Sequence, residues 1–114
     1  MTEKHKQFIQ GFREVQEEVL EVSKAKGWWN ENRNDGELLA LVHSEVSELL
    51  EGLRHGNPPD DKIPEFSCAE AEAADTVIRL MDLCEARGWR LAEAIAAKIE
   101  FNKTRSTRHG GKRF

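Results

Sequence analysis

Long apolar runs are missing from this sequence. No stretch of its 114 residues approaches the roughly 20 consecutive apolar residues that a transmembrane helix requires. The first seven residues are polar and lack the apolar segment of a signal peptide. We therefore expect a cytoplasmic protein without a membrane partner.

Cysteine is scarce, and the two that occur are badly spaced for a disulfide. Cys68 and Cys84 fall within one expected helix, where a rise of about 1.5 Å per residue separates them by roughly 24 Å. A disulfide needs Cα atoms less than about 7 Å apart. We expect both to be reduced thiols in the core.

Alternating apolar and polar residues, which would indicate strands, are also absent over any useful length. Apolar residues instead recur at spacings of three and four, which is typical of amphipathic helices. Helices are expected at about 3–26, 35–55, 67–88 and 90–104. The clearest stripes are Phe8, Phe12, Val15, Val19 and Val22 in the first helix, Leu38, Val42, Val46, Leu49 and Leu53 in the second, Val77, Leu80, Met81 and Cys84 in the third, and Leu91, Ala94, Ile95 and Ile99 in the fourth.

The boundaries of these helices carry local signals. Gly27 and Gly88 suit helix ends, Asn34 or Asp35 can cap the second helix, and Ser67 with Glu70 forms a capping box. The pattern predicts one all-α domain over residues 1–114, an antiparallel four-helix bundle. Because a chain this short buries a limited core, we expect a homodimer or homotetramer.

Charge is distributed unevenly, although the formal net charge is only -4. The chain is basic from Lys98 onward, and we expect residues 106–114 to be a mobile basic tail. Charge alone would allow this tail to contact either a phosphate ligand or nucleic acid. We favour the phosphate ligand and do not expect nucleic acid as a partner.

Two carboxylate pairs stand at helical spacing. Glu45 with Glu48, and Glu72 with Asp75, each lie three residues apart and so share a side of their helix. Their similar distances from the connecting proline loop predict that the four acids converge across the hairpin. Such a cluster would repel itself unless cations neutralised it, and oxygen ligands favour Mg²⁺, with Mn²⁺ as a possible substitute. The alternative is four solvated acids on exposed helix faces.

The fourth helix offers a cationic face. Lys98, Asn102 and Arg105 follow one another at spacings of four and three, and the antiparallel register predicts that Lys98 and Asn102 reach the height of Glu72 and Asp75. These side chains could bind phosphates beside the metal. They could also simply complement the helix dipole near its C-terminus.

Trp28 and Trp29 stand in a polar loop. Either ring could stack on a nucleobase while Asn30 or Asn32 contacts the base edge. The alternative is a lid over one end of the bundle, because tryptophan usually buries most of its area.

Three segments together resemble one known family. They are Leu39-Ala40-Leu41-Val42-His43-Ser44-Glu45-Val46-Ser47-Glu48-Leu49, Glu72-Ala73-Ala74-Asp75 and Lys98-Ile99-Glu100-Phe101-Asn102. The ordered pattern is similar to that of the MazG-like nucleoside triphosphate pyrophosphohydrolases, over roughly residues 8–113.

The resemblance implies an all-α fold shared with dimeric dUTPases and subunits that pair through their bundles. It implies Mg²⁺-assisted hydrolysis of a (d)NTP to (d)NMP and pyrophosphate, a house-cleaning reaction of the nucleotide pool. By position, Glu45, Glu48, Glu72 and Asp75 would hold metal, with Glu45 or Glu48 as catalytic base, and Lys98, Asn102 and Arg105 would contact phosphate. Trp28, Trp29 and Asn32 would lie on the base side.

Two other functions fit parts of the sequence. A non-catalytic helical dimerisation module with a basic, nucleic-acid-contacting tail would explain the apolar stripes equally well. An enzyme acting on a phosphorylated non-nucleotide would explain the acids, because only the tryptophan loop argues for a base.

Overall fold

The computed structural model describes residues 1–105, and the expected basic tail, 106–114, lies outside the described residues. In chain order the helices are α1 (Glu3–Ala25), α2 (Asp35–Arg54), α3 (Cys68–Arg87) and α4 (Leu91–Lys103). Within residues 1–105 the extended structure amounts to an isolated bridge between Pro59 and Ser67. The predicted all-α class is therefore confirmed.

The helix ends follow the local signals. The Asn34 side chain accepts a hydrogen bond from the backbone N–H of Glu37 at 2.7 Å, and Ser67 and Glu70 form a complete capping box. Gly27 and Gly88 have φ values of 80° and 73°, a left-handed conformation that residues with a Cβ rarely adopt. These turns set where each helix stops and the next begins.

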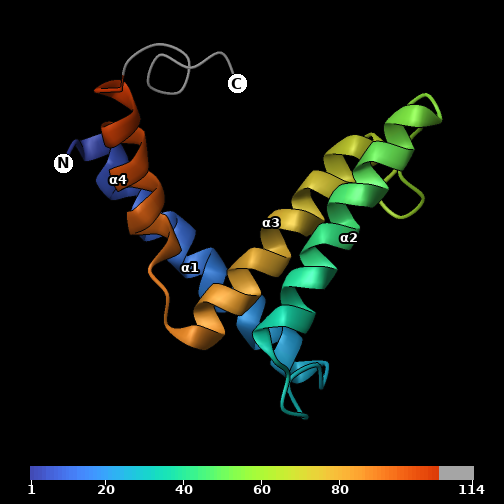
Figure 1. The fold of residues 1–114 in the computed structure, drawn as a ribbon, viewed down its shortest axis with the longest axis horizontal. Helices are drawn as coiled ribbons and strands as arrows, with labels where there is room; N and C mark the ends of the chain where they lie inside the picture. The colour runs from blue at the N-terminus through green and yellow to red at the C-terminus, as the bar shows by residue number, and fades with distance from the viewer. Residues whose placement is uncertain (106–114) are drawn as a thin grey trace.

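The helices form two diverging arms rather than one closed bundle (Figure 1). Helices α2 and α3 pack as an antiparallel hairpin, α1 packs against α3, and α4 packs against α1. The expected return of α4 alongside α3 is not seen in the single chain. The Cα radius of gyration is 16.6 Å, whereas a compact chain of this length has about 13 Å.

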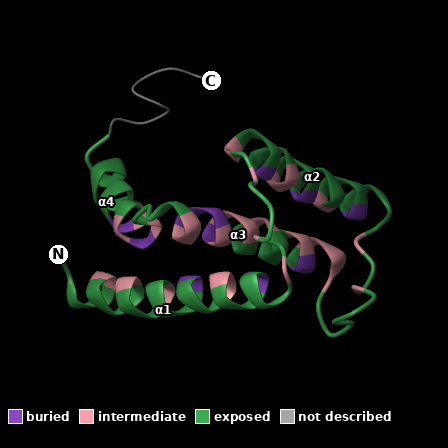
Figure 2. Cartoon of the chain, turned by 90° about the horizontal axis from the view of Figure 1, so that it is seen from below, coloured by how far each residue is buried: buried purple, intermediate pink, exposed green. Residues whose placement is uncertain are grey.

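The open shape leaves the core small. Fully buried apolar side chains come mainly from α3 and α4 and include Met81, Leu83 and Ala92. In Figure 2 buried positions occupy narrow strips along the facing sides of the helices. Members of the predicted stripes remain about half exposed, with Val46 at 50% and Leu53 at 51%. The single chain thus covers only part of its apolar surface.

Both cysteines are free thiols, Cys84 buried and Cys68 half-buried. None of the helices in the described part of the chain is long and apolar enough to cross a membrane.

Candidate metal centre and adjoining cavity

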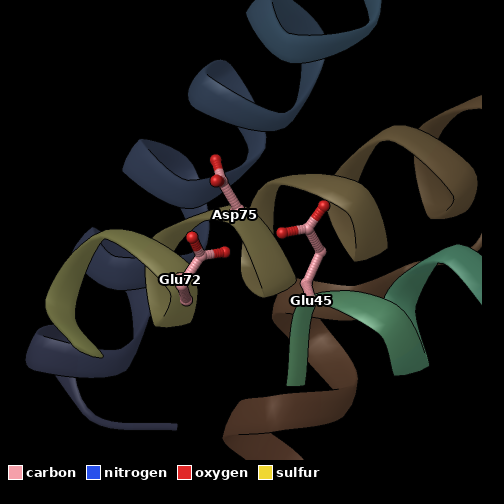
Figure 3. A group of neighbouring side chains, drawn as sticks. All are labelled: Glu45, Glu72 and Asp75. Carbon is pink, nitrogen blue, oxygen red and sulfur yellow. The ribbon is translucent and has the colours of Figure 1, made fainter. Parts of the chain in front are cut away.

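Three of the four predicted acids meet on the α2–α3 hairpin. Glu45 of α2 and Glu72 and Asp75 of α3 each offer a carboxylate oxygen, and these atoms lie within 4.8 Å of one another. Figure 3 shows the three side chains as neighbours, Glu45 on α2 and Glu72 and Asp75 on α3. The spacing of three residues brings Glu72 and Asp75 to one side of α3, and the antiparallel hairpin brings Glu45 opposite them.

Glu48, the fourth predicted acid, is exposed and stands beside this group rather than in it. Its charge nevertheless contributes to raising the pKa values of Glu72 and Asp75. Glu48 is therefore electrostatically part of the cluster and close to Glu72, although it is not one of the three grouped acids.

The cluster carries more negative charge than its surroundings neutralise. Burial, followed by contact with Glu45 and Glu48, raises the pKa of Glu72 to about 7 from its ordinary 4.5. Burial and the charge of Glu45 also raise the pKa of Asp75. The Glu72 Oε2 atom is buried and has no hydrogen-bond partner within residues 1–105. A buried, unpartnered carboxylate oxygen is costly, and a cation at this point would remove the cost.

An arginine that the sequence reasoning missed partly balances the acids. The Arg79 Nε atom donates to Glu45 Oε1 at 2.8 Å, and Glu45 itself is only 7% exposed. Arg79 also lowers the pKa of Asp75, although burial outweighs this effect. The spacing of four residues from Asp75 to Arg79 on one helix face was the available signal. One guanidinium leaves the other carboxylates uncompensated.

A cavity of about 610 Å³ adjoins the acids and lies between α1, α3 and the start of α2. This volume is within the range of small-molecule sites. One side is apolar, through Val15, Val19, Val22, Leu38, Ile78 and Leu83. The charged side chains around it are Glu18, Arg33, Glu45, Lys62, Asp75, Arg79 and Asp82. The cavity thus has an apolar wall on one side and borders the cluster of acids that could hold a metal ion.

The two tryptophans have different surroundings. The Trp29 Nε1 atom donates to Ser23 Oγ at 3.0 Å and to Asp82 Oδ1 at 3.1 Å, and the guanidinium carbons of Arg33 and Arg87 lie 5.8 and 5.7 Å from its ring centroid. Trp29 is thus tied into the protein, as the lid interpretation expects. Trp28 lines the cavity and is 57% exposed.

Asn32 is exposed and is absent from the described lining of the cavity. Its expected contact with a base edge stays a prediction. Trp28 is accordingly the predicted base-side residue that the structure brings to the cavity.

The predicted phosphate-binding face is not brought to the acids by the single chain. Lys98, Asn102 and Arg105 are exposed, and the Lys98 Nζ atom lies 5.6 Å from the centroid of the Phe101 ring. None of the three is among the described residues that line the cavity. Helix α4, which carries Lys98 and Asn102 and ends two residues before Arg105, packs on α1, in the arm away from α2 (Figure 1). The register estimate failed because it assumed that α4 runs beside α3.

Lys62, Arg33 and Arg79 supply the positive charge that does line the cavity. Lys62 belongs to the loop between α2 and α3, where Asp60 Oδ2 accepts the backbone N–H groups of Lys62 and Ile63 at 2.9 and 3.0 Å. No periodicity could have revealed Lys62, because its position depends on how this loop folds back.

Comparison with known proteins adds no family to these observations. No family model matches the chain, and neither the curated proteins nor the solved structures contain a match.

Proposed function

We propose that this protein is a Mg²⁺-dependent nucleoside triphosphate pyrophosphohydrolase of the MazG-like kind, which converts a (d)NTP to (d)NMP and pyrophosphate. The observation that carries the proposal is the meeting of Glu45, Glu72 and Asp75 beside a nucleotide-sized cavity, with a buried Glu72 oxygen that lacks a partner. The order of the three resembling segments supports the choice of family.

The donor set fits a hard divalent cation. Carboxylate oxygens within 4.8 Å of one another suit Mg²⁺ or Mn²⁺, which prefer oxygen ligands, whereas softer metals prefer cysteine or histidine. Glu45, Glu72 and Asp75 would hold the ion, and Glu48 would stand beside them, close to Glu72. Burial and the neighbouring Glu45 and Glu48 raise the pKa of Glu72, and the positive charge of a bound ion would lower it again.

The residues would divide the chemistry among them. When bound, Mg²⁺ would neutralise phosphate charge and favour attack by water on the α-phosphorus. Glu45 or Glu48 would accept the proton of that water as general base. Arg79 and Lys62, which line the cavity, would stabilise the charge that develops on departing pyrophosphate.

The assembly we propose is a homodimer or homotetramer. The exposed apolar side chains on α1, α2 and α3 would be covered by a second copy. Contact of Lys98, Asn102 and Arg105 with phosphate then requires the α4 helix of another subunit, because the α4 of the same chain lies on the other arm.

A panel of canonical and damaged (d)NTPs with Mg²⁺, scored for monophosphate and pyrophosphate, tests the activity. Release of orthophosphate would overturn attack at the α-phosphorus, and turnover of phosphorylated non-nucleotides alone would overturn the substrate class. Glu51→Gln is a matched control for the acid variants, because Glu51 is an exposed glutamate of α2 outside the cluster.

The exposed apolar faces favour one alternative, a non-catalytic dimerisation module. Thermal melting with and without Mg²⁺ and a nonhydrolysable nucleotide separates the two functions. A ligand at 100 times its Kd adds about 2.7 kcal/mol to the free energy of unfolding. The dimerisation module predicts no such increase.

A further inference from the structure

Asp82 lies at the end of the cavity away from the acid cluster. It belongs to the same face of α3 as Asp75, seven residues further along, which is roughly 10 Å at the rise of an α-helix. A sugar and a base span a similar distance beyond an α-phosphate. A nucleotide whose phosphates lie at the acids would therefore extend its base toward Asp82.

The Asp82 carboxylate is held in one orientation by two donors from outside α3. Ser23 Oγ donates to Asp82 Oδ1 at 2.6 Å, and Trp29 Nε1 donates to both oxygens, at 3.1 and 3.2 Å. Ser23 is fully buried and Trp29 is half-buried, so neither donor is free to turn away. The side chain is thus fixed before any ligand binds.

Asp82 still has unused acceptor capacity. A carboxylate offers about four lone-pair sites, and two donor groups occupy only part of them. The carboxylate forms no ion pair within residues 1–105. Because Asp82 lines the cavity, a bound molecule can reach it.

A stacking surface stands next to this acceptor. Trp28 lies in the turn after α1, directly before Trp29, and Trp29 is the residue bonded to Asp82. Arg33 Nη1 donates to the Trp28 carbonyl oxygen at 3.4 Å, and this hydrogen bond links the start of the loop between α1 and α2 to its later part. The exposed indole of Trp28 and the apolar side chain of Val22 both line the cavity here. Aromatic stacking holds a base without choosing among bases, so the choice falls to the polar group at its edge.

We propose that Asp82 reads the edge of the base and selects nucleotides with an amino group there, namely those of cytosine, adenine or guanine, against uracil and thymine. The proposal rests on the function proposed above. An ionised carboxylate only accepts hydrogen bonds, and the exocyclic amino groups of these three bases donate them. Uracil and thymine present a carbonyl oxygen at the position where cytosine has its amino group. Two acceptors facing each other lose the hydrogen bond and repel.

Asp82→Asn tests this assignment with little change in shape. The asparagine oxygen can still accept from Ser23 and Trp29, while its NH₂ group turns a donor toward the cavity. We expect wild-type kcat/KM with Mg²⁺ to be higher for dCTP than for dUTP, and Asp82→Asn to lower that ratio roughly 10-fold to 100-fold. Glu85→Gln is the matched control, an acid-to-amide change on the same helix outside this cavity, and should leave the ratio unchanged.

The outcomes separate this inference from the proposed function. If no triphosphate is hydrolysed, the proposed function fails, and calorimetry with nonhydrolysable dCTP and dUTP analogues then decides the inference by the ratio of their Kd values. If triphosphates are hydrolysed but wild type prefers dUTP, or Asp82→Asn leaves the ratio unchanged, the inference alone is overturned. Ser23→Ala removes one donor and keeps the carboxylate, so a partial loss of the preference is expected there even if Asp82→Asn does not fold.

Discussion

The two arms of the molecule differ in what determines their geometry. In the α2–α3 arm, two consecutive helices pack antiparallel across the loop at residues 55–67, and Glu45 meets Glu72 and Asp75 as the spacing predicts. In the other arm α4 packs not on the helix before it but on α1, at the opposite end of the chain. The acid cluster, built from helices that are neighbours in sequence, thus forms within one chain, whereas the basic face of α4 lies apart from it.

The largest effect is expected from removing a ligand in the α2–α3 arm. Asp75→Asn should lower Mg²⁺-dependent turnover about 100-fold or more, because an amide keeps the shape of the carboxylate but not its charge. Steady-state kinetics over a range of Mg²⁺ concentrations measures the loss, with Glu51→Gln as control. Turnover near the wild-type level in Asp75→Asn would contradict the metal assignment.

A substitution in the α4 arm should cause a smaller loss of activity. Lys98→Ala removes the proposed phosphate contact and should reduce kcat/KM about 10-fold to 100-fold. If that contact comes from another subunit, mixing inactive Asp75→Asn with Lys98→Ala chains and allowing exchange regains activity, since some sites then combine an intact acid cluster with an intact lysine. Lys103→Ala is the control, because Lys103 already pairs with Glu100 at 3.0 Å. An unchanged rate after exchange would place Lys98 outside any shared site.

The same contrast explains which features the sequence could reveal. Capping at Asn34 and Ser67, the stops at Gly27 and Gly88, and the acid pairs are local patterns that depend on helical spacing alone. The course of α4 depends on contacts with a helix about 90 residues earlier, which no local pattern encodes. A one-dimensional register estimate therefore placed Lys98 beside Asp75 when the helices in fact diverge.

The residues that line the cavity could be predicted from the sequence only in part. Arg79 and Asp82 continue the face of Asp75 at spacings of four and seven, so helical periodicity could have identified both. The distinct roles of Trp28 and Trp29 could not be assigned in this way. Trp29 is distinguished by its bond to Asp82, a residue 53 positions away that the fold brings to it.

A smaller effect concerns pH and the stability of the α2–α3 arm. In the folded protein the pKa of Glu72 is raised to about 7 from 4.5, so between these values the folded state binds more protons than the unfolded state. The free energy of unfolding of the metal-free protein should therefore fall as pH rises from about 4.5 to about 7, and this contribution should level off above that. Urea unfolding in EDTA across this range measures the slope, which Glu72→Gln should flatten.

Magnesium supplies the control for that experiment. The loss of stability at higher pH is attributed to repulsion among the ionised carboxylates of the acid cluster. If this is its source, Mg²⁺ should stabilise the protein more at pH 8 than at pH 5.5, because protonated carboxylates bind metal poorly. Equal stabilisation at both pH values would mean that the ion binds elsewhere.

The smallest effect is expected where Gly52 of α2 faces Cys68 at the start of α3. A Cβ placed on Gly52 would lie 2.5 Å from Cys68 Sγ and 3.2 Å from Cys68 Cβ, so Gly52→Ala should force the helices apart near the acids. Overpacking of this kind costs about 1–3 kcal/mol, partly offset by about 1 kcal/mol from the better helix propensity of alanine. The net loss in the free energy of unfolding should be about 1 kcal/mol by urea titration.

Adding Cys68→Ala removes the opposing sulfur and should restore stability to the Gly52→Ala variant. If the double variant is no more stable than Gly52→Ala, close contact with Cys68 is not what requires glycine at this position.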